Sequence, residues 1–338
     1  MKSRTFKMFS ARTAMLMLAT LFSAGAWAQL SEGTTFQLIP NGSGLFKAVI
    51  HGNTTSDCGI EETAGPILNE IVCEREFKVG VPATIVLPFP TKDFTVTGGN
   101  FYEFACVEWN SDKGQWVASM KQVDENNLLR NTPYIIVPTS TTLNFNMNGN
   151  TVKAFTDVAT VTCDCWSFVG TYKMTYWIDA SVNAAETDLV KEVDHTLVVV
   201  GDEPGDYYGF AATDGTAVGG GSVAAGEFVK CSGDGSSANT AFILPMRAYL
   251  KFVGDENCPA NKDTQMLQRK NSAAAILPTR IAVVLLDKNG EVTSVGTISE
   301  KTGEITFEGW FTLDGIKLPA EPTKSGIYIH NGKKVVVK

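Results

Sequence analysis

Histidine is scarce in this chain, and the motifs of several enzyme classes are absent from it. Only three histidines occur, and none has another metal ligand two or four residues away. A histidine needs an oriented base, acid or metal partner to become catalytic, and the sequence offers none nearby. A nucleophile elbow, a zinc-protease motif, a phosphate-binding loop and a dinucleotide fingerprint are all missing. We therefore predict a protein that is not an enzyme and that needs neither a metal nor a cofactor.

Basic residues are also few, and long apolar runs are missing after the first 28 residues. Removing those residues takes four basic side chains from 28 and none from the 36 acidic ones, which leaves a net charge of −12. An acidic chain without a basic stripe argues against nucleic acid and against anionic membrane surfaces as partners. The sequence predicts no membrane span in the mature chain.

The N-terminal segment has the features of a signal peptide. Four basic residues precede or flank the start of an apolar run at 13–26, which is shorter than the 20 or so residues that a spanning helix needs. Ala26 and Ala28 form the small-residue pattern of a cleavage site. We expect residues 1–28 to be removed, so that the mature protein starts at Gln29 and is exported to the cell surface or the medium, or alternatively to the periplasm.

Alternation of apolar and polar residues dominates the mature chain. Leu143, Phe145 and Met147 alternate with asparagines, as in a strand with one solvated face. Other runs are apolar on both faces and predict strands buried between two layers; they are 83–89, 101–109, 195–200 and 280–286. Short turn sequences rich in Gly, Asn and Asp separate these runs. The pattern predicts an all-β fold of antiparallel β-sandwich type.

The mature chain is long enough for one large or two medium domains. We predict a large β-sandwich region at 29–262, a linker or short helix at 263–276, and a small C-terminal β unit at 277–338. Within that last unit, the sequence predicts a hairpin with strands at 327–330 and 333–337 around a tight Asn-Gly turn. We expect this hairpin to pack with strands near 305–313 and 281–286.

Seven cysteines lie in the mature chain, and export to an oxidising compartment permits disulfides. Short loops cost least entropy to close, which favours the pairs Cys58–Cys73 and Cys231–Cys258. Cys163 and Cys165 lie on the same face of one predicted strand and should therefore find partners elsewhere. A zinc site at this Cys-x-Cys sequence lacks a supporting CxxC or histidine, and we expect none.

Aromatic residues supply the best argument for binding. Exposed Trp and Tyr rings on a sandwich suit sugars or protein partners, because large rigid rings give contact area at low entropic cost. The alternative for each ring is packing in the core. The candidate binding residues are Trp109, Trp116, Tyr172, Trp177, Tyr207 and Tyr208.

With the strands laid out, the chain resembles a β module of secreted Bacteroidota proteins, which stands alone or follows leucine-rich repeats in surface proteins. The segments that carry the resemblance include VGVPATIVLPF at 79–89, GGNFYEFACVEWNSDKGQW at 98–116, WSFVGTYKMTYW at 166–177 and FILPMRAYLKF at 242–252. The resemblance implies export and surface display, and it implies no catalytic residue.

The C-terminal sequence GIYIHNGKKVVVK at 326–338 resembles the sorting domains of type IX secretion cargo. That resemblance implies that the export machinery recognises the tail. The alternative is that the tail is only the closing hairpin of its domain, with lysines that protect an edge strand.

Two functions follow as hypotheses. The first is a non-catalytic surface or extracellular protein with an adhesion, glycan-contact or structural role, and the second is a secreted polysaccharide- or peptide-acting hydrolase whose carboxylates the fold assembles.

Overall fold

The computed structural model confirms an all-β protein. It describes residues 34–52, 54–110, 114–157, 160–183, 189, 196–200, 207–216, 222–223, 225–236, 239–253, 277–294, 296–298, 305–307, 310–312, 317–318, 321–330 and 333–337. Within these ranges the regular elements are strands and one 3₁₀ helix, η1 (Glu125–Asn127). None of the described elements is a helix with the length and apolar character to cross a membrane. The predicted signal peptide (1–28), the predicted linker (263–276) and Cys258 lie outside the described residues.

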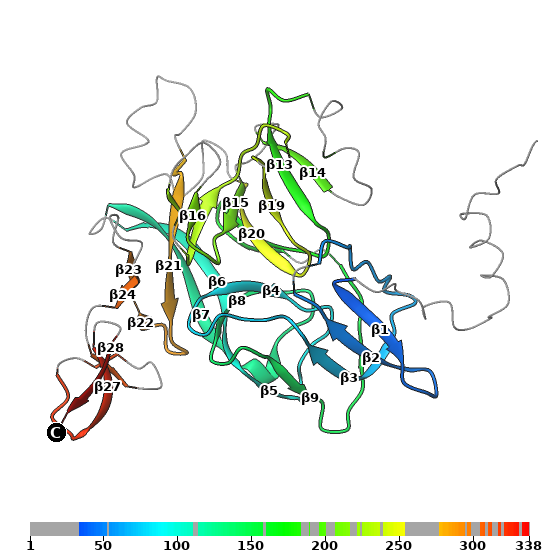
Figure 1. Cartoon of the computed structure of the whole chain (residues 1–338), viewed down its shortest axis with the longest axis horizontal. Coiled ribbons are helices and arrows are strands. Elements are labelled where there is room, and N and C mark those ends of the chain that lie inside the picture. The colour runs from blue at the N-terminus through cyan, green and yellow to red at the C-terminus, as the bar shows by residue number, and fades with distance from the viewer. Residues whose placement is uncertain are drawn as a thin grey trace, which may run out of the picture.

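The N-terminal half builds a six-stranded sheet, drawn in blue to green in Figure 1. Its strands, in spatial order, are β1 (Phe36–Pro40), β2 (Leu45–Ile50), β3 (Ile67–Cys73), β9 (Asn144–Asn146) and β5 (Thr95–Thr97), with β10 (Val152–Lys153) beside β3. β2 and β3 run parallel, whereas the other pairs are antiparallel. Apolar side chains from these strands and from the neighbouring 83–89 segment form the first core.

An eleven-stranded sheet makes up most of the remaining fold. Its strands, in spatial order, are β11 (Thr160–Cys163), β12 (Trp166–Thr171), β20 (Arg247–Phe252), β15 (Tyr207–Phe210), β18 (Glu227–Lys230), β21 (Arg280–Leu286), β7 (Gln115–Val123), β6 (Gly99–Asn110), β8 (Pro133–Pro138) and β4 (Ala83–Val86), with β22 (Val292–Ser294) beside β21. The sheet curls so that its end strand β4 meets β20, the third strand from the other end. Val86 N donates to Met246 O at 3.3 Å, and Ala248 N donates to Thr84 Oγ1 at 3.1 Å.

Curling gives this large sheet an inner face, which aromatic side chains fill. β20 illustrates how the sequence produces that face, because Ala248, Leu250 and Phe252 are buried while Tyr249 and Lys251 between them are only partly covered. The second core also contains side chains from β6, β7, β12, β15, β18 and β21. It is a packed interior, and the aromatic residues in it bury large areas per residue.

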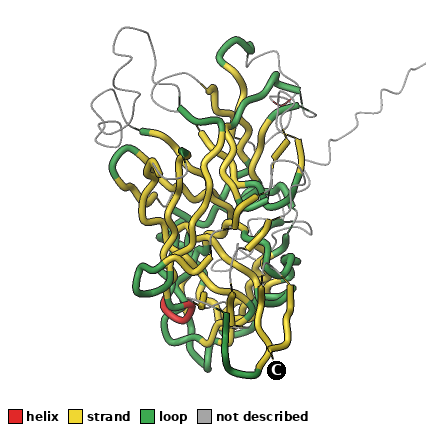
Figure 2. Tube along the Cα trace, turned by 90° about the vertical axis from the view of Figure 1, so that its left-hand side faces the viewer, coloured by secondary structure: helices red, strands yellow, loops and turns green. Residues whose placement is uncertain are grey.

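Smaller sheets complete the described fold. They are β14 (Thr196–Val200), β13 (Thr175–Asp179) and β19 (Ala241–Ile243); β16 (Gly215–Thr216) and β17 (Ser222–Val223); β23 (Gly296–Ile298) and β24 (Ile305–Phe307); and β26 (Lys317–Leu318), β25 (Trp310–Thr312), β27 (Gly326–His330) and β28 (Lys333–Val337). Strands, in yellow, run through the whole body of the molecule in Figure 2.

The predicted C-terminal hairpin is confirmed. β27 and β28 pair antiparallel in the expected register, with His330 opposite Lys333. β27 also pairs with β25, as predicted from the 305–313 segment.

The predicted contact with 281–286 differs from the structure. β21 pairs with β18 and β7 in the large sheet, where its side chain Ile281 is buried in the second core. The chain therefore returns to the large sheet after the predicted boundary at 277.

Candidate functional site

A tight turn between β11 and β12 lies at one end of the large sheet. Cys163 pairs directly with Trp166, so that Asp164 and Cys165 alone form the turn. Asp164 has a φ of 51°. This left-handed conformation suits two-residue hairpins, and aspartate tolerates it better than most residues because its short side chain can bond locally.

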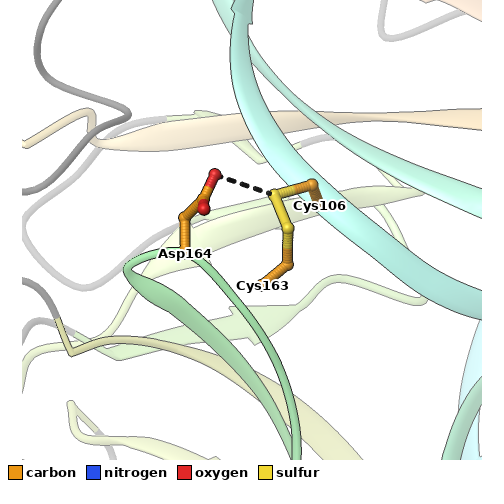
Figure 3. A group of neighbouring side chains, drawn as sticks. All are labelled: Cys106, Cys163 and Asp164. Atoms are coloured by element: carbon orange, nitrogen blue, oxygen red, sulfur yellow. Dashed lines mark hydrogen bonds between the residues drawn. A yellow bond between two sulfur atoms is a disulfide. The ribbon is translucent and has the colours of Figure 1, made fainter.

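A disulfide joins this turn to β6. Cys106 and Cys163 are bonded, with their Cα atoms 5.2 Å apart, and Asp164 Oδ2 lies 3.8 Å from the Cys106 sulfur (Figure 3). The pairing of β6 with β7 shifts register between Phe104 and Cys106. Such bulges re-aim side chains, and this one lies where Cys106 leaves the β6–β7 ladder to bond β11. Cys165 is also disulfide-bonded.

A row of three tryptophans runs from solvent into the second core beside this turn. Trp109 on β6 pairs with Trp116 on β7, and their ring centroids are 5.9 Å apart at an interplanar angle of 73°. Trp116 in turn contacts Trp166 at 6.1 Å. The exposed fraction falls from 40% at Trp109 to 3% at Trp116 and 0% at Trp166. We call Trp109, Trp116 and Trp166 the tryptophan row.

The other predicted binding rings do not form an exposed platform. Trp116, Tyr172, Trp177 and Tyr208 are all buried. Two of them use their hydroxyl groups inside the protein, since Tyr172 donates to Asn131 Oδ1 at 2.7 Å and Tyr208 donates to Pro278 O at 2.9 Å. These aromatic residues serve the core, and of the six candidates Trp109 is the exposed one.

Tyr207, the remaining candidate, is half-buried. Its ring lies 6.1 Å from the Trp177 ring and 6.0 Å from the Tyr249 ring, and Lys251 Nζ is 5.3 Å from its centroid. The Tyr207 ring therefore packs against neighbouring side chains and does not present a free face to a ligand.

The two predicted disulfides are absent. Cys58, Cys73 and Cys231 carry free, buried thiols. Loop entropy favours short closures, but strand geometry decides where each sulfur lies: Cys58 Sγ donates to Tyr172 O at 3.3 Å, and Cys231 Sγ contacts Val229 O at 3.9 Å. The expectation that Cys163 bonds outside its own strand is confirmed by its bond to Cys106.

The three free thiols should be inert in the folded protein. Burial raises the pKa of Cys231 to about 12, and burial also raises the pKa values of Cys58 and Cys73 above their ordinary range. Because the thiolate is the reactive form, a thiol reagent at neutral pH should modify them slowly in the native state and fully after unfolding without reduction. Peptide mapping by mass spectrometry checks this prediction. Alkylation of Cys106 or Cys163 in the unfolded, unreduced sample would contradict the disulfide assignment.

Two covered arginines, the buried Arg75 and the half-buried Arg247, were not identified from the sequence. Arg75 is 6% exposed, donates from Nη1 to Thr84 O at 3.0 Å, and has its guanidinium 4.5 Å from the Phe77 ring centroid. Arg247 donates from Nη2 to Gly52 O at 2.9 Å. Burial lowers the pKa of both, to about 10 for Arg247, and the second cation lowers the pKa of Arg75 further. Among the described residues, no carboxylate forms an ion pair with either.

The signal for Arg75 was present in the sequence. The alternation of β3 continues past its end, so that Cys73, Arg75 and Phe77 face inward while Glu74 and Glu76 face solvent. Because all three residues at 74–76 are charged, the segment resembles a solvated surface, and the inward direction of Arg75 was not recognised. Arg75 ties the end of β3 to β4 and does not face an open site.

A shallow pocket of about 310 Å³ lies elsewhere on the sheet surface; it is lined by Glu103, Val123, Asp124, Asn127, Leu129 and Tyr134. Asp124 Oδ1 accepts hydrogen bonds from Asn126 N at 3.1 Å and from Asn126 Nδ2 at 3.3 Å. That carboxylate therefore caps η1.

Comparison with known proteins gives no relative: no family model, no curated protein and no solved structure matches this chain.

Proposed function

We propose that this chain is an exported, non-catalytic β protein that contacts glycans through Trp109 in an adhesive or structural role. The observation that carries the proposal is the exposed Trp109 ring on a rigid support. Trp116 packs against it, Trp166 packs against Trp116, and the Cys106–Cys163 disulfide ties β6 to β11 three residues before Trp109.

The support matters because binding loses affinity whenever side chains must be ordered on contact. A tryptophan ring has few rotatable bonds and offers a large apolar face, which suits the apolar face of a sugar ring. Trp109 is held from one side by Trp116 and is open on another, so its position is set before a ligand arrives. A protein partner is the alternative occupant of the same face.

Replacing Trp109 by Ala should abolish glycan binding and leave the fold intact. The ring is 40% exposed, so its removal costs little packing. Phe242→Ala is the matched control, because Phe242 is an aromatic residue that is 54% exposed on a different sheet, in β19. A glycan array probed with the unchanged protein and both variants measures the effect, with circular dichroism as the check on folding. Equal glycan binding by all three proteins would show that Trp109 does not contribute to binding and would contradict the proposal.

The hydrolase alternative has a weaker basis among the described residues. Glu103 and Asp124 both line the shallow pocket, but the Asp124 carboxylate is engaged by Asn126 as a helix cap. A glycosidase needs two carboxyl groups that are free to act on a sugar between them. The binding proposal is therefore preferred, and turnover of the array's bound glycans by the unchanged protein would favour the hydrolase.

For localisation, we propose export guided by residues 1–28 and recognition of the 326–338 tail by the export machinery. The tail's accessibility supports this. Ile327 and Val336 face each other across the β27–β28 hairpin and are both exposed. The described residues of β25 to β28 pair with one another and with no strand of the large sheet.

Deleting residues 326–338 should yield a folded protein that accumulates in the periplasm. The large sheet keeps all of its described pairings in the shortened chain, because β27 and β28 pair with none of its strands. Cell fractionation followed by immunoblotting measures the location. Delivery of the shortened protein to the surface at the normal level would show that the tail is only a closing hairpin whose lysines protect an edge strand.

A further inference from the structure

Three potential metal ligands meet at the β11–β12 turn. The two sulfurs of Cys106 and Cys163 and a carboxylate oxygen of Asp164 all lie within 4.8 Å of one another. Figure 3 shows Asp164 directed toward the bonded sulfurs. The three side chains come from separate backbone features, namely the β6 bulge, the end of β11 and the left-handed turn residue.

In the oxidised protein the sulfurs are bonded to each other and carry no thiolate, so they are not metal ligands. We propose that reduction of the Cys106–Cys163 disulfide converts this corner into a binding site for a zinc-class divalent cation. Its ligands are the two thiolates and the Asp164 carboxylate, with water in the fourth position.

The chemistry balances with a dithiol as the reductant. The dithiol gives two electrons and two protons to the disulfide, becomes a disulfide itself, and leaves thiols on Cys106 and Cys163. Cation binding then displaces the two thiol protons into solvent and forms two metal–sulfur bonds. A carboxylate and two thiolates match the tetrahedral ligand sets that zinc accepts, with one position left open.

The backbone already has suitable dimensions. Two sulfurs at the usual Zn–S distance on one tetrahedral ion lie about 3.8 Å apart. With the Cα atoms of Cys106 and Cys163 at 5.2 Å, side-chain rotation can open the sulfurs to that separation. Asp164 is exposed, Cys163 is half-buried and Cys106 is buried, so an ion would approach from the Asp164 side. Strand pairing of Cys163 with Trp166 fixes the turn that carries Asp164.

Cobalt titration of the full chain tests the site, because thiolate ligands give Co²⁺ a charge-transfer band. After reduction with a phosphine under anaerobic conditions, the protein should bind about one Co²⁺ per chain, and the oxidised protein should bind none. Zn²⁺ should displace the cobalt and raise the melting temperature of the reduced protein.

Variants separate this site from other thiols. Cys163→Ser should lose the band, and Asp164→Asn should keep it with affinity weakened by about 10-fold. Two controls should leave the titration unchanged: Cys165→Ser, which removes a thiol that the same phosphine releases in the turn, and Cys231→Ser, which removes a buried thiol elsewhere. The proposal is overturned by a full band in Cys163→Ser, by unchanged affinity in Asp164→Asn, or by a reduced chain that binds no Co²⁺.

Discussion

Replacing Cys106 and Cys163 together by Ala should lower the free energy of unfolding by about 4 kcal/mol. The bond links residues separated by 57 positions, and closing so long a loop in the unfolded chain removes a large part of its conformational entropy. The bond also ties β11, the outermost strand at one end of the large sheet, to β6 near the other end. Without it, β11 is held by its pairing with β12 and by the packing of Val161 and Cys163 against the second core.

Equilibrium unfolding in urea measures this loss. Cys231→Ala is the matched control, since it removes one buried cysteine that forms no disulfide; it should cost about 1 kcal/mol by loss of packing. A double variant that unfolds at the same urea concentration as this control would show that β11 is held by packing alone. Limited proteolysis adds a local measure, because cleavage near 160–163 should accelerate in the double variant.

The fold class followed from the sequence because side-chain alternation is a local property of a strand. The β27–β28 hairpin is a clear example: two runs of β-forming residues on either side of an Asn-Gly sequence define both strands and their register without help from distant residues. Strand partners are a different matter. β21 is an apolar run of the kind predicted, yet its place between β18 and β7 depends on sheet curvature that no local pattern encodes.

Burial of aromatic residues likewise depends on distant parts of the chain that no local pattern encodes. Trp109 and Trp116 flank one turn, and the local sequence does not distinguish them. Their exposed fractions nevertheless are 40% and 3%. What separates them is Trp166, some fifty residues later, which packs on Trp116 and not on Trp109. Disulfide pairing failed for a related reason. Sequence distance orders the entropy of closing loops, whereas the bulge in β6 brings Cys106 to Cys163 across a long separation.

Replacing Trp166 by Ala should destabilise the protein by about 3–5 kcal/mol, the range found for large buried aromatic residues. Trp166 is fully buried, and its ring contacts Trp116, Tyr208 and Phe252, the last with centroids 5.1 Å apart. The cavity left by Ala lies at the centre of the second core, where neighbours from several strands cannot all collapse into it.

Trp166→Phe should cost much less than Trp166→Ala. The indole Nε1 of Trp166 is buried and has no hydrogen-bond partner among the described residues. An unsatisfied buried donor carries a desolvation penalty of about 1–3 kcal/mol, which Phe removes while keeping most of the aromatic contact. Urea unfolding of both variants measures the difference. If Phe proves as costly as Ala, the indole N–H has a partner after all, such as a buried water, and the loss of that bond accounts for the cost.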